Sequence, residues 1–286
     1  MPQPVLTIDA APTLHIDLRP VGVVHSPVAD LIEMPPEGLP ATIEVFPEYA
    51  SGLFRLESNT HITVVGWLDR ARRDTLETVR PNGRGDPRRR GVFACRCQAR
   101  PNPIGVTSTR LLRIEGHQLH VAPLDMIDGT PVLDIKPYSA SFDCMFSARS
   151  SRDVSPAQDH PSQRDQRLML REAVNFHGEL CRGVALGVKM VSHMRMVFSA
   201  AQKDPEVVVL LGQDGCLCDA LQGLCGATFG NGRLRLSGDH RSGFLFRGRE
   251  LLFSPKAHYS APPEDLLEMA VDQLFEVEET GGEDRP

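Results

Sequence analysis

Residues 147–165 constrain the fold most, because this segment reads SARSSRDVSPAQDHPSQRD and contains almost no apolar side chains. Such a composition cannot contribute to a hydrophobic core and is typical of a linker. The chain has 286 residues, which is long enough for two ordinary domains. The sequence therefore predicts a domain at 1–146, a linker at 147–165, a second domain at 166–277 and a disordered tail at 278–286.

The segment before the linker has the pattern of a mainly β domain. Short apolar and β-branched runs recur between Gly and Pro residues, at the spacing of a barrel or a sandwich. We expect strands at residues 21–25, 62–68, 91–94, 109–114, 119–121 and 132–135, and one or two helical turns at 70–79.

The segment after the linker has the pattern of an α+β domain. Apolar residues at helical spacing predict two helices, and Pro262-Pro263 before two acidic residues predicts a third. We expect these helices at 168–176, 184–200 and 263–275, and strands at 207–211, 233–237, 244–247 and 251–254.

Charge and cysteine content restrict the function classes. The net charge of −6 argues against a general nucleic-acid binder, but residues 69–100 hold ten arginines against four acids. That stretch could attract an anionic substrate, or it could be a solvated loop. The chain has seven cysteines, no apolar run of membrane-spanning length and no signal-peptide pattern at its start. We therefore expect reduced thiols, no membrane partner and a cytoplasmic protein.

The densest motif is GVFACRCQARPNPIG at residues 91–105. Two prolines stiffen this loop, which could hold Arg96, Arg100 and Asn102 at fixed angles. Two arginines and an amide form a suitable cradle for a carboxylate or a phosphate. Composition alone does not name the ligand.

A second motif, LDMIDGTPVLDIKPY, occupies residues 124–138. Its DGTP sequence is typical of a turn. The alternation that follows places Asp134 and Lys136 on one face of a strand. A plain hairpin with a surface ion pair is the alternative interpretation.

Together, these two motifs resemble the TsaA-like (TrmO) family, whose best-known members methylate N6 of threonylcarbamoyladenosine 37 in tRNA. The resemblance covers about residues 19–146 and includes PVGVVHSP at 20–27 and PEGL at 36–39. It implies a small β-barrel, S-adenosylmethionine as the cofactor, and a homodimer that builds its site near the subunit interface.

Position by position, the resemblance also implies a set of site residues. The implied cofactor contacts are Pro36, Glu37, Gly38, Asp69, Arg70, Arg96, Val106, Leu124, Asp125, Asp128, Gly129 and Thr130. An N6 atom that bears a carbamoyl group is a poor nucleophile until its proton is removed. A nearby carboxylate or cation should therefore promote the loss of that proton. Asp128, Asp134 and Lys136 are the catalytic candidates. Arg100, Asn102 and Tyr138 are the candidate substrate contacts.

The chain departs from the family pattern at three positions. Cys95 and Cys97 stand where the family commonly has Thr and Ser, and Asp69 stands where members often carry His. A thiol forms weaker hydrogen bonds than a hydroxyl, so the geometry of the site could differ. The paired thiols could also form a metal site or a redox site.

Histidine and cysteine residues cluster in the second domain. His177 and Cys181 are four residues apart, and Cys216, Cys218 and Cys225 follow later. Imidazole and thiolate donors suit zinc or another transition metal. Buried cysteines without a metal are the alternative.

The sequences around these residues, FHGELCRGVALG at 176–187 and DGCLCDALQGLCGATFGNG at 214–232, resemble the FmdE family across about 166–277. That family takes its name from a component of formylmethanofuran dehydrogenase. Relative to its pattern, Glu179 replaces a histidine and Ala227 replaces a cysteine. The resemblance implies metal binding but leaves the ligand set open. It does not imply that this chain acts on formylmethanofuran.

Three functions fit these observations. The first is a tRNA methyltransferase, with tRNA as its partner and the second domain as an accessory metal-binding module. The second is a methyltransferase for a small metabolite or a metal-linked ligand that the second domain presents. The third is a non-enzymatic sensor of a metal or of S-adenosylmethionine.

Overall fold

A computed structural model of the chain describes residues 17–79, 89–148, 163–238, 241–256 and 261–281. The chain divides into two compact units, Met1–Ala140 and Ser141–Pro286. Most of the predicted linker lies outside the described residues, and its last three residues begin helix α2 (Gln163–His177). Among the described residues, no helix is both long and apolar enough to cross a membrane.

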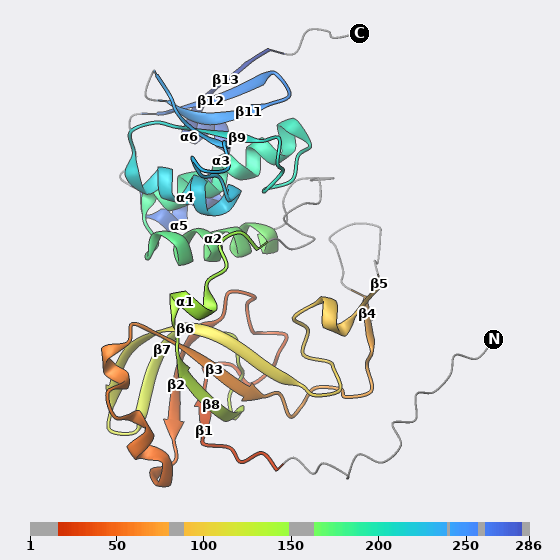
Figure 1. The fold of residues 1–286 in the computed structure, drawn as a ribbon, viewed down its shortest axis with the longest axis vertical. Coiled ribbons are helices and arrows are strands. Elements are labelled where there is room, and N and C mark those ends of the chain that lie inside the picture. The colour runs from red at the N-terminus through yellow and green to blue at the C-terminus, as the bar shows by residue number, and fades with distance from the viewer. Residues whose placement is uncertain (1–16, 80–88, 149–162, 239–240, 257–260, 282–286) are drawn as a thin grey trace, which may run out of the picture. The chain divides into compact units, whose positions relative to one another are not determined.

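The first unit is a closed, antiparallel six-stranded barrel in the order β1-β2-β7-β6-β3-β8 (Figure 1). The strands are β1 (Gly22–His25), β2 (Leu39–Val45), β3 (His61–Trp67), β6 (Ile104–Glu115), β7 (Gln118–Leu124) and β8 (Pro131–Pro137). Inward and outward residues alternate along each strand, so Ile43, Ile62 and Leu119 are fully buried inside the barrel. The predicted β-barrel is therefore confirmed.

The first unit contains smaller elements outside the barrel. They are the 3-10 helices η1 (Pro47–Leu53), η2 (Leu56–Ser58) and η3 (Val92–Ala94), the strand pair β4 (Glu77–Val79) and β5 (Arg89–Gly91), and part of α1 (Ala140–Asp143).

Two of these elements correct the predictions made from sequence. The helical turns predicted at 70–79 are wrong for the last three residues, which form β4 and pair with β5. Thr78 and Val79 are β-branched and fit an extended strand better than a helix. The strand predicted at 91–94 is wrong as well, because η3 occupies residues 92–94.

The second unit contains a five-stranded mixed sheet in the order β10-β9-β11-β12-β13 (Figure 1). Its strands are β9 (Val208–Leu211), β10 (Leu234–Leu236), β11 (Ser242–Phe246), β12 (Arg249–Pro255) and β13 (Phe275–Thr280). Its helices, besides α2, are α3 (Arg182–Phe198), α4 (Gly215–Cys225), α5 (Pro263–Glu268) and α6 (Val271–Leu274). Ten residues of α3 are buried, so this helix forms the centre of the core. The predicted α+β class is confirmed.

The C-terminal part of this unit differs from the prediction. The helix predicted at 263–275 is two short helices separated at Met269 and Ala270, whose backbone is extended. The disorder predicted from residue 278 is wrong through Thr280, because β13 pairs with β12. The remainder of the predicted tail, 282–286, lies outside the described residues.

Candidate cofactor and metal sites

Three chain connections meet at one end of the barrel. Residues 26–38 join β1 to β2, residues 68–103 join β3 to β6, and residues 125–130 join β7 to β8. The register places the strand ends together, because Leu39 pairs with Leu124 and Trp67 pairs with Ile104. Every predicted cofactor residue lies in one of these connections or, like Val106 and Leu124, in a strand end beside them.

Gly38 brings the first and third connections into contact. Its φ is +84°, and a Cβ atom at this position would lie 2.7 Å from the backbone carbon of Leu124. Only glycine permits both this backbone conformation and this approach. Beside the contact, the carboxylate of Asp125 accepts a hydrogen bond from the hydroxyl of Thr107.

The Asp128-Gly129-Thr130 turn packs against the end of β1. The backbone N–H of Ser26 donates to Asp128 Oδ1 at 3.1 Å, and the N–H of Gly129 donates to the Val24 carbonyl at 2.8 Å. The Asp128 side chain nevertheless remains 48% exposed. The fold therefore fixes a carboxylate at the rim of the barrel where a ligand can reach it.

Three arginines of the second connection make different contacts. Arg70 donates to the Ala29 carbonyl at 3.0 Å, so it joins the first and second connections. Arg96 donates to the Val106 carbonyl at the start of β6. Arg100, predicted to contact substrate, donates to the carbonyls of three residues of its own loop: Val92, Cys95 and Cys97. Its observed contacts therefore hold the loop.

The remaining candidates do not all lie at this end. Asn102 lies in the second connection, and its carbonyl accepts from the N–H of Ile104 at 2.8 Å. Lys136 and Asp134 form an exposed ion pair of 2.6 Å on β8. Lys136 lies five residues beyond the start of β8, roughly 17 Å along the strand. Tyr138 follows β8, and its N–H donates to the carbonyl of His61 at the opposite end of the barrel.

The chemistry of this barrel end fits S-adenosylmethionine. That molecule carries an ammonium, a carboxylate, a sulfonium and an adenine ring. Carboxylates at Asp125 and Asp128 suit the positive groups, and the guanidinium groups of Arg70 and Arg96 suit the carboxylate. Val106 supplies apolar surface, because its side chain is partly exposed on β6.

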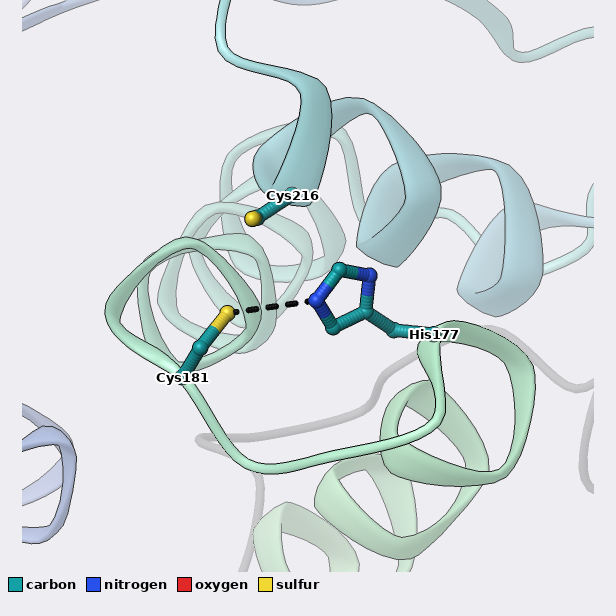
Figure 2. Close-up of side chains that lie close together, drawn as sticks. All are labelled: His177, Cys181 and Cys216. Atoms are coloured by element: carbon teal, nitrogen blue, oxygen red, sulfur yellow. Dashed lines mark hydrogen bonds between the residues drawn. The ribbon is translucent and has the colours of Figure 1, made fainter.

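A second candidate site lies in the α+β unit. His177, Cys181 and Cys216 point toward one another from the ends of three helices (Figure 2). Their ligand atoms all lie within 4.8 Å of one another, and Cys181 Sγ is 3.5 Å from His177 Nε2. Three of the five predicted metal ligands therefore meet.

Two glycines explain why the helix ends converge. A Cβ at Gly183 would lie 2.5 Å from the Cβ of Cys216, so α3 approaches the first turn of α4 only because residue 183 has no side chain. A Cβ at Gly223 would lie 2.7 Å from the Cβ of Phe176, the neighbour of His177. Small residues on α3 and α4 thus set the distances within the cluster.

Charge and hydrogen bonding also favour a cation at this cluster. Asp219 Oδ2 lies 3.0 Å from His177 Nδ1, which leaves Nε2 facing Cys181. The hydrogen bond with the adjacent Cys181 thiol is the main reason that the pKa of Cys216 is raised, followed by burial and by repulsion between the two thiolates. A bound cation would remove that repulsion, and two sulfurs with one imidazole nitrogen suit zinc.

The other two predicted ligands lie outside this cluster. Cys218 donates to the Gly212 carbonyl, with sulfur and oxygen 3.6 Å apart. Cys225 is completely buried in the hydrophobic core, and burial raises its pKa to about 12. Such a thiol behaves as a small apolar side chain.

Three further residues contact the candidate sites and were not predicted from the sequence. Thr107 contacts Asp125, and Asp219 contacts His177. The third residue is His25, whose Nδ1 lies 4.0 Å from Asp128 Oδ1. The Nε2 atom of His25 contacts Glu44 at 2.8 Å. His25 and Asp219 lie within the quoted motifs PVGVVHSP and DGCLCDALQ. Their position inside these motifs is the sequence feature that could have identified them as site residues.

Comparisons with known families agree with this division of the chain. The family described as tRNA-methyltransferase O N-terminal domain matches residues 23–144. The family described as FmdE, Molybdenum formylmethanofuran dehydrogenase operon, matches residues 176–268. The first match contains the barrel, and the second contains the histidine–cysteine cluster.

Three curated relatives define the similarity further. A "Probable S-adenosyl-L-methionine-binding protein" of Archaeoglobus fulgidus is 40% identical over 77% of this chain, which spans 60% of that relative. An "S-adenosyl-L-methionine-binding protein" of the same organism is 43% identical over 45% of this chain and 93% of its own length. A mouse "tRNA (adenine(37)-N6)-methyltransferase" is 46% identical over 26% of this chain and 16% of its own length.

Proposed function

Because this chain belongs to the family with the tRNA-methyltransferase O N-terminal domain, we propose that it is an S-adenosylmethionine-dependent methyltransferase acting on N6 of threonylcarbamoyladenosine 37 in tRNA. The observation that carries the proposal is the meeting of the three connections, with their acidic and basic residues, at one end of the barrel. The name of the mouse relative supports the choice of acceptor.

The chain's own residues have three tasks in this reaction. S-adenosylmethionine supplies an electrophilic methyl group on its sulfonium. Arg70 and Arg96 bind its carboxylate, and the connections exclude water from the reacting groups. Asp128 accepts the proton of N6 in this proposal, and the support is that its carboxylate is held by the N–H of Ser26 and remains accessible.

The basic stretch at 69–100 supplies the surface for tRNA. It belongs to the second connection and therefore begins and ends beside the candidate cofactor residues. Arg72 pairs with Asp74 and Arg89 pairs with Glu77, both at exposed positions. Arg80, Arg84 and Arg88 lie outside the described residues. A polyanion gains affinity from such a cluster even on an acidic protein.

For the second domain, we propose an accessory role with one bound transition metal, held by His177, Cys181 and Cys216. The support is the mutual distance of their ligand atoms and the orientation of His177 by Asp219. Bound there, zinc would supply a Lewis acid or a structural crosslink.

We further propose that the protein acts in the cytoplasm as a homodimer. Phe93 and Leu76 are large apolar side chains of the second connection and are 84% and 64% exposed. Covering such side chains by a second copy would bury apolar surface beside the site. Sedimentation velocity of the full chain measures the mass, and a monomer at micromolar concentration would contradict this part.

A methyl-transfer assay tests the function. The full-length protein is incubated with trideuteromethyl S-adenosylmethionine and with tRNA that carries threonylcarbamoyladenosine 37. Nucleoside mass spectrometry should then show a trideuteromethyl group on that nucleoside and none on tRNA that lacks the threonylcarbamoyl group. If the protein binds the cofactor but transfers no methyl group to either tRNA, a small-metabolite acceptor would be favoured. If it binds no cofactor, both the tRNA methyltransferase and the small-metabolite methyltransferase would be contradicted.

A further inference from the structure

Cys95 and Cys97 lie on either side of Arg96 in the loop that follows η3. Both thiols are half-buried, and Cys95 Sγ lies 2.7 Å from Cys97 Sγ. A disulfide has a sulfur–sulfur distance of about 2.05 Å, so closing the bond requires a movement of about 0.7 Å. The fold therefore holds two cysteines almost in position for a bond between them.

The surroundings show that the loop backbone imposes this proximity. Arg100 donates from Nε to the Cys97 carbonyl at 2.8 Å and from Nη2 to the Cys95 carbonyl. One guanidinium thus binds the backbone on both sides of Arg96. The two sulfurs also donate to backbone carbonyls of this loop, Cys95 to Val92 and Cys97 to Ala99.

We propose that Cys95 and Cys97 form a reversible disulfide by exchange with a low-molecular-weight disulfide, and that this bond regulates the cofactor site. One cysteine thiolate attacks the small disulfide and releases one small thiolate. The second cysteine then attacks the sulfur of the first and releases the other small thiolate. The two cysteine protons go to water, and the small disulfide takes up the two electrons.

The regulation follows from the position of Arg96 and rests on the proposed function. Arg96 lies between the two cysteines and donates to the Val106 carbonyl in the reduced protein. A disulfide across residues 95 and 97 closes a small ring through the Arg96 backbone and so redirects its side chain. The Thr and Ser that are common at these positions in TsaA-like sequences could not form this bond.

The protonation of the pair sets the conditions for measuring exchange. Burial and the neighbouring Cys95 thiol raise the pKa of Cys97, and Arg100 opposes this only in part. Exchange requires a thiolate, so it should be faster at higher pH. The full-length protein is therefore equilibrated at pH 8.5 with oxidised or reduced glutathione, and the remaining thiols are alkylated.

Trypsin makes the bond easy to detect, because it cleaves after Arg96, between the two cysteines. After oxidised glutathione, mass spectrometry should find the peptide ending in Arg96 joined to the peptide beginning with Cys97. The two should be separate after reduced glutathione. The peptide map also distinguishes this bond from one between Cys181 and Cys216, whose sulfurs are close together as well.

Calorimetry with S-adenosylmethionine then measures the consequence. Oxidised protein should bind at least about tenfold more weakly than reduced protein, the effect of losing one charged hydrogen bond. The double variant Cys95→Thr/Cys97→Ser should bind equally well with either form of glutathione. Separate peptides at every glutathione ratio would overturn the disulfide, and joined peptides with unchanged affinity would overturn the regulation. If the reduced protein binds no cofactor, the proposed function is contradicted. The joined or separate tryptic peptides still show whether the disulfide forms.

Discussion

Arginines of the same loop make different contacts in this protein. Arg100 binds three carbonyls within its own loop, whereas Arg96 reaches across to the carbonyl of Val106. The sequence indicated that both side chains act from this loop. It could not assign contacts to each side chain, because the distances from each guanidinium to the backbone carbonyls depend on how residues 92–97 fold back toward Arg100. That fold includes η3, which the sequence pattern did not predict.

The first prediction separates these two arginines. Arg96→Ala should weaken S-adenosylmethionine binding by about 1.5–3 kcal/mol, the range for a hydrogen bond to a charged group. Arg113→Ala is the matched control, because Arg113 pairs with Glu115 near the other end of β6. Isothermal calorimetry on the full chain measures both, and an equal effect of the two substitutions would contradict the cofactor role of Arg96.

Arg100→Ala should instead reduce the stability of the barrel, by about 1–3 kcal/mol, because three carbonyls lose a donor. The protein has one tryptophan, Trp67, at the end of β3. Its fluorescence during urea unfolding therefore reports on the barrel unit alone. An unchanged urea midpoint would show that the Arg100 contacts do not stabilise the loop.

A third prediction for single residues concerns the metal ligands and pH. His177→Ala and Cys216→Ser should abolish stoichiometric zinc binding, while Cys218→Ser and Cys225→Ala should retain it. Because the pKa of Cys216 is raised, its thiol keeps its proton at neutral pH and metal binding must displace it. Zinc affinity should therefore rise with pH between 6 and 9, as competition with a chromophoric chelator can measure. Zinc lost from the Cys218 or Cys225 variant would contradict the three-residue site.

At the scale of elements, small residues determine how the helices of the second unit approach one another. Gly183 permits the contact between α3 and the first turn of α4. Gly183→Ala should separate Cys181 from Cys216 and weaken zinc binding at least tenfold, and overpacking should cost about 1–3 kcal/mol of stability. Gly215→Ala is the control, because a Cβ there meets nothing within 4 Å. Chelator competition compares them, and equal affinities would contradict the packing argument.

The strand β13 leads to another prediction at this scale. Phe275 is 1% exposed, and its ring packs edge-on against Phe253 at 5.3 Å between centroids. Phe275→Ala should therefore destabilise the second unit by about 3–5 kcal/mol, whereas exposed Glu276→Ala should change stability by less than about 0.5 kcal/mol. Differential scanning calorimetry of the full chain measures both variants, and a similar melting temperature for the two would contradict the packing role of Phe275.

The elements also show how far the sequence predicts the fold. Strands whose apolar residues alternate, such as β3 and β8, were predicted within one or two residues. β13 was not, because EVEET resembles a disordered acidic tail by composition. Two of its charges are instead paired with arginines, Glu279 with Arg249 of the neighbouring strand β12 and Glu278 with Arg241, the residue before β11. Such pairing depends on residues far away in the sequence.

At the scale of the whole molecule, each unit carries one candidate site. The proposed cofactor residues all belong to the barrel unit, and the histidine–cysteine cluster belongs to the α+β unit. This separation was predictable, because the motifs of the first site all precede the linker and the motifs of the second site all follow it. The number of metal ligands was not, because it depends on how α2, α3 and α4 pack.

Methylation of threonylcarbamoyladenosine in tRNA is the activity that we propose for this protein. The most direct test is nucleoside mass spectrometry of tRNA from cells with the gene, without it, and with the gene restored as wild type or as Arg96→Ala. N6-methylated threonylcarbamoyladenosine should be present with the gene, disappear on deletion, and return with the wild type but much less with the variant. The same amount of this nucleoside in cells with and without the gene would contradict the proposed activity.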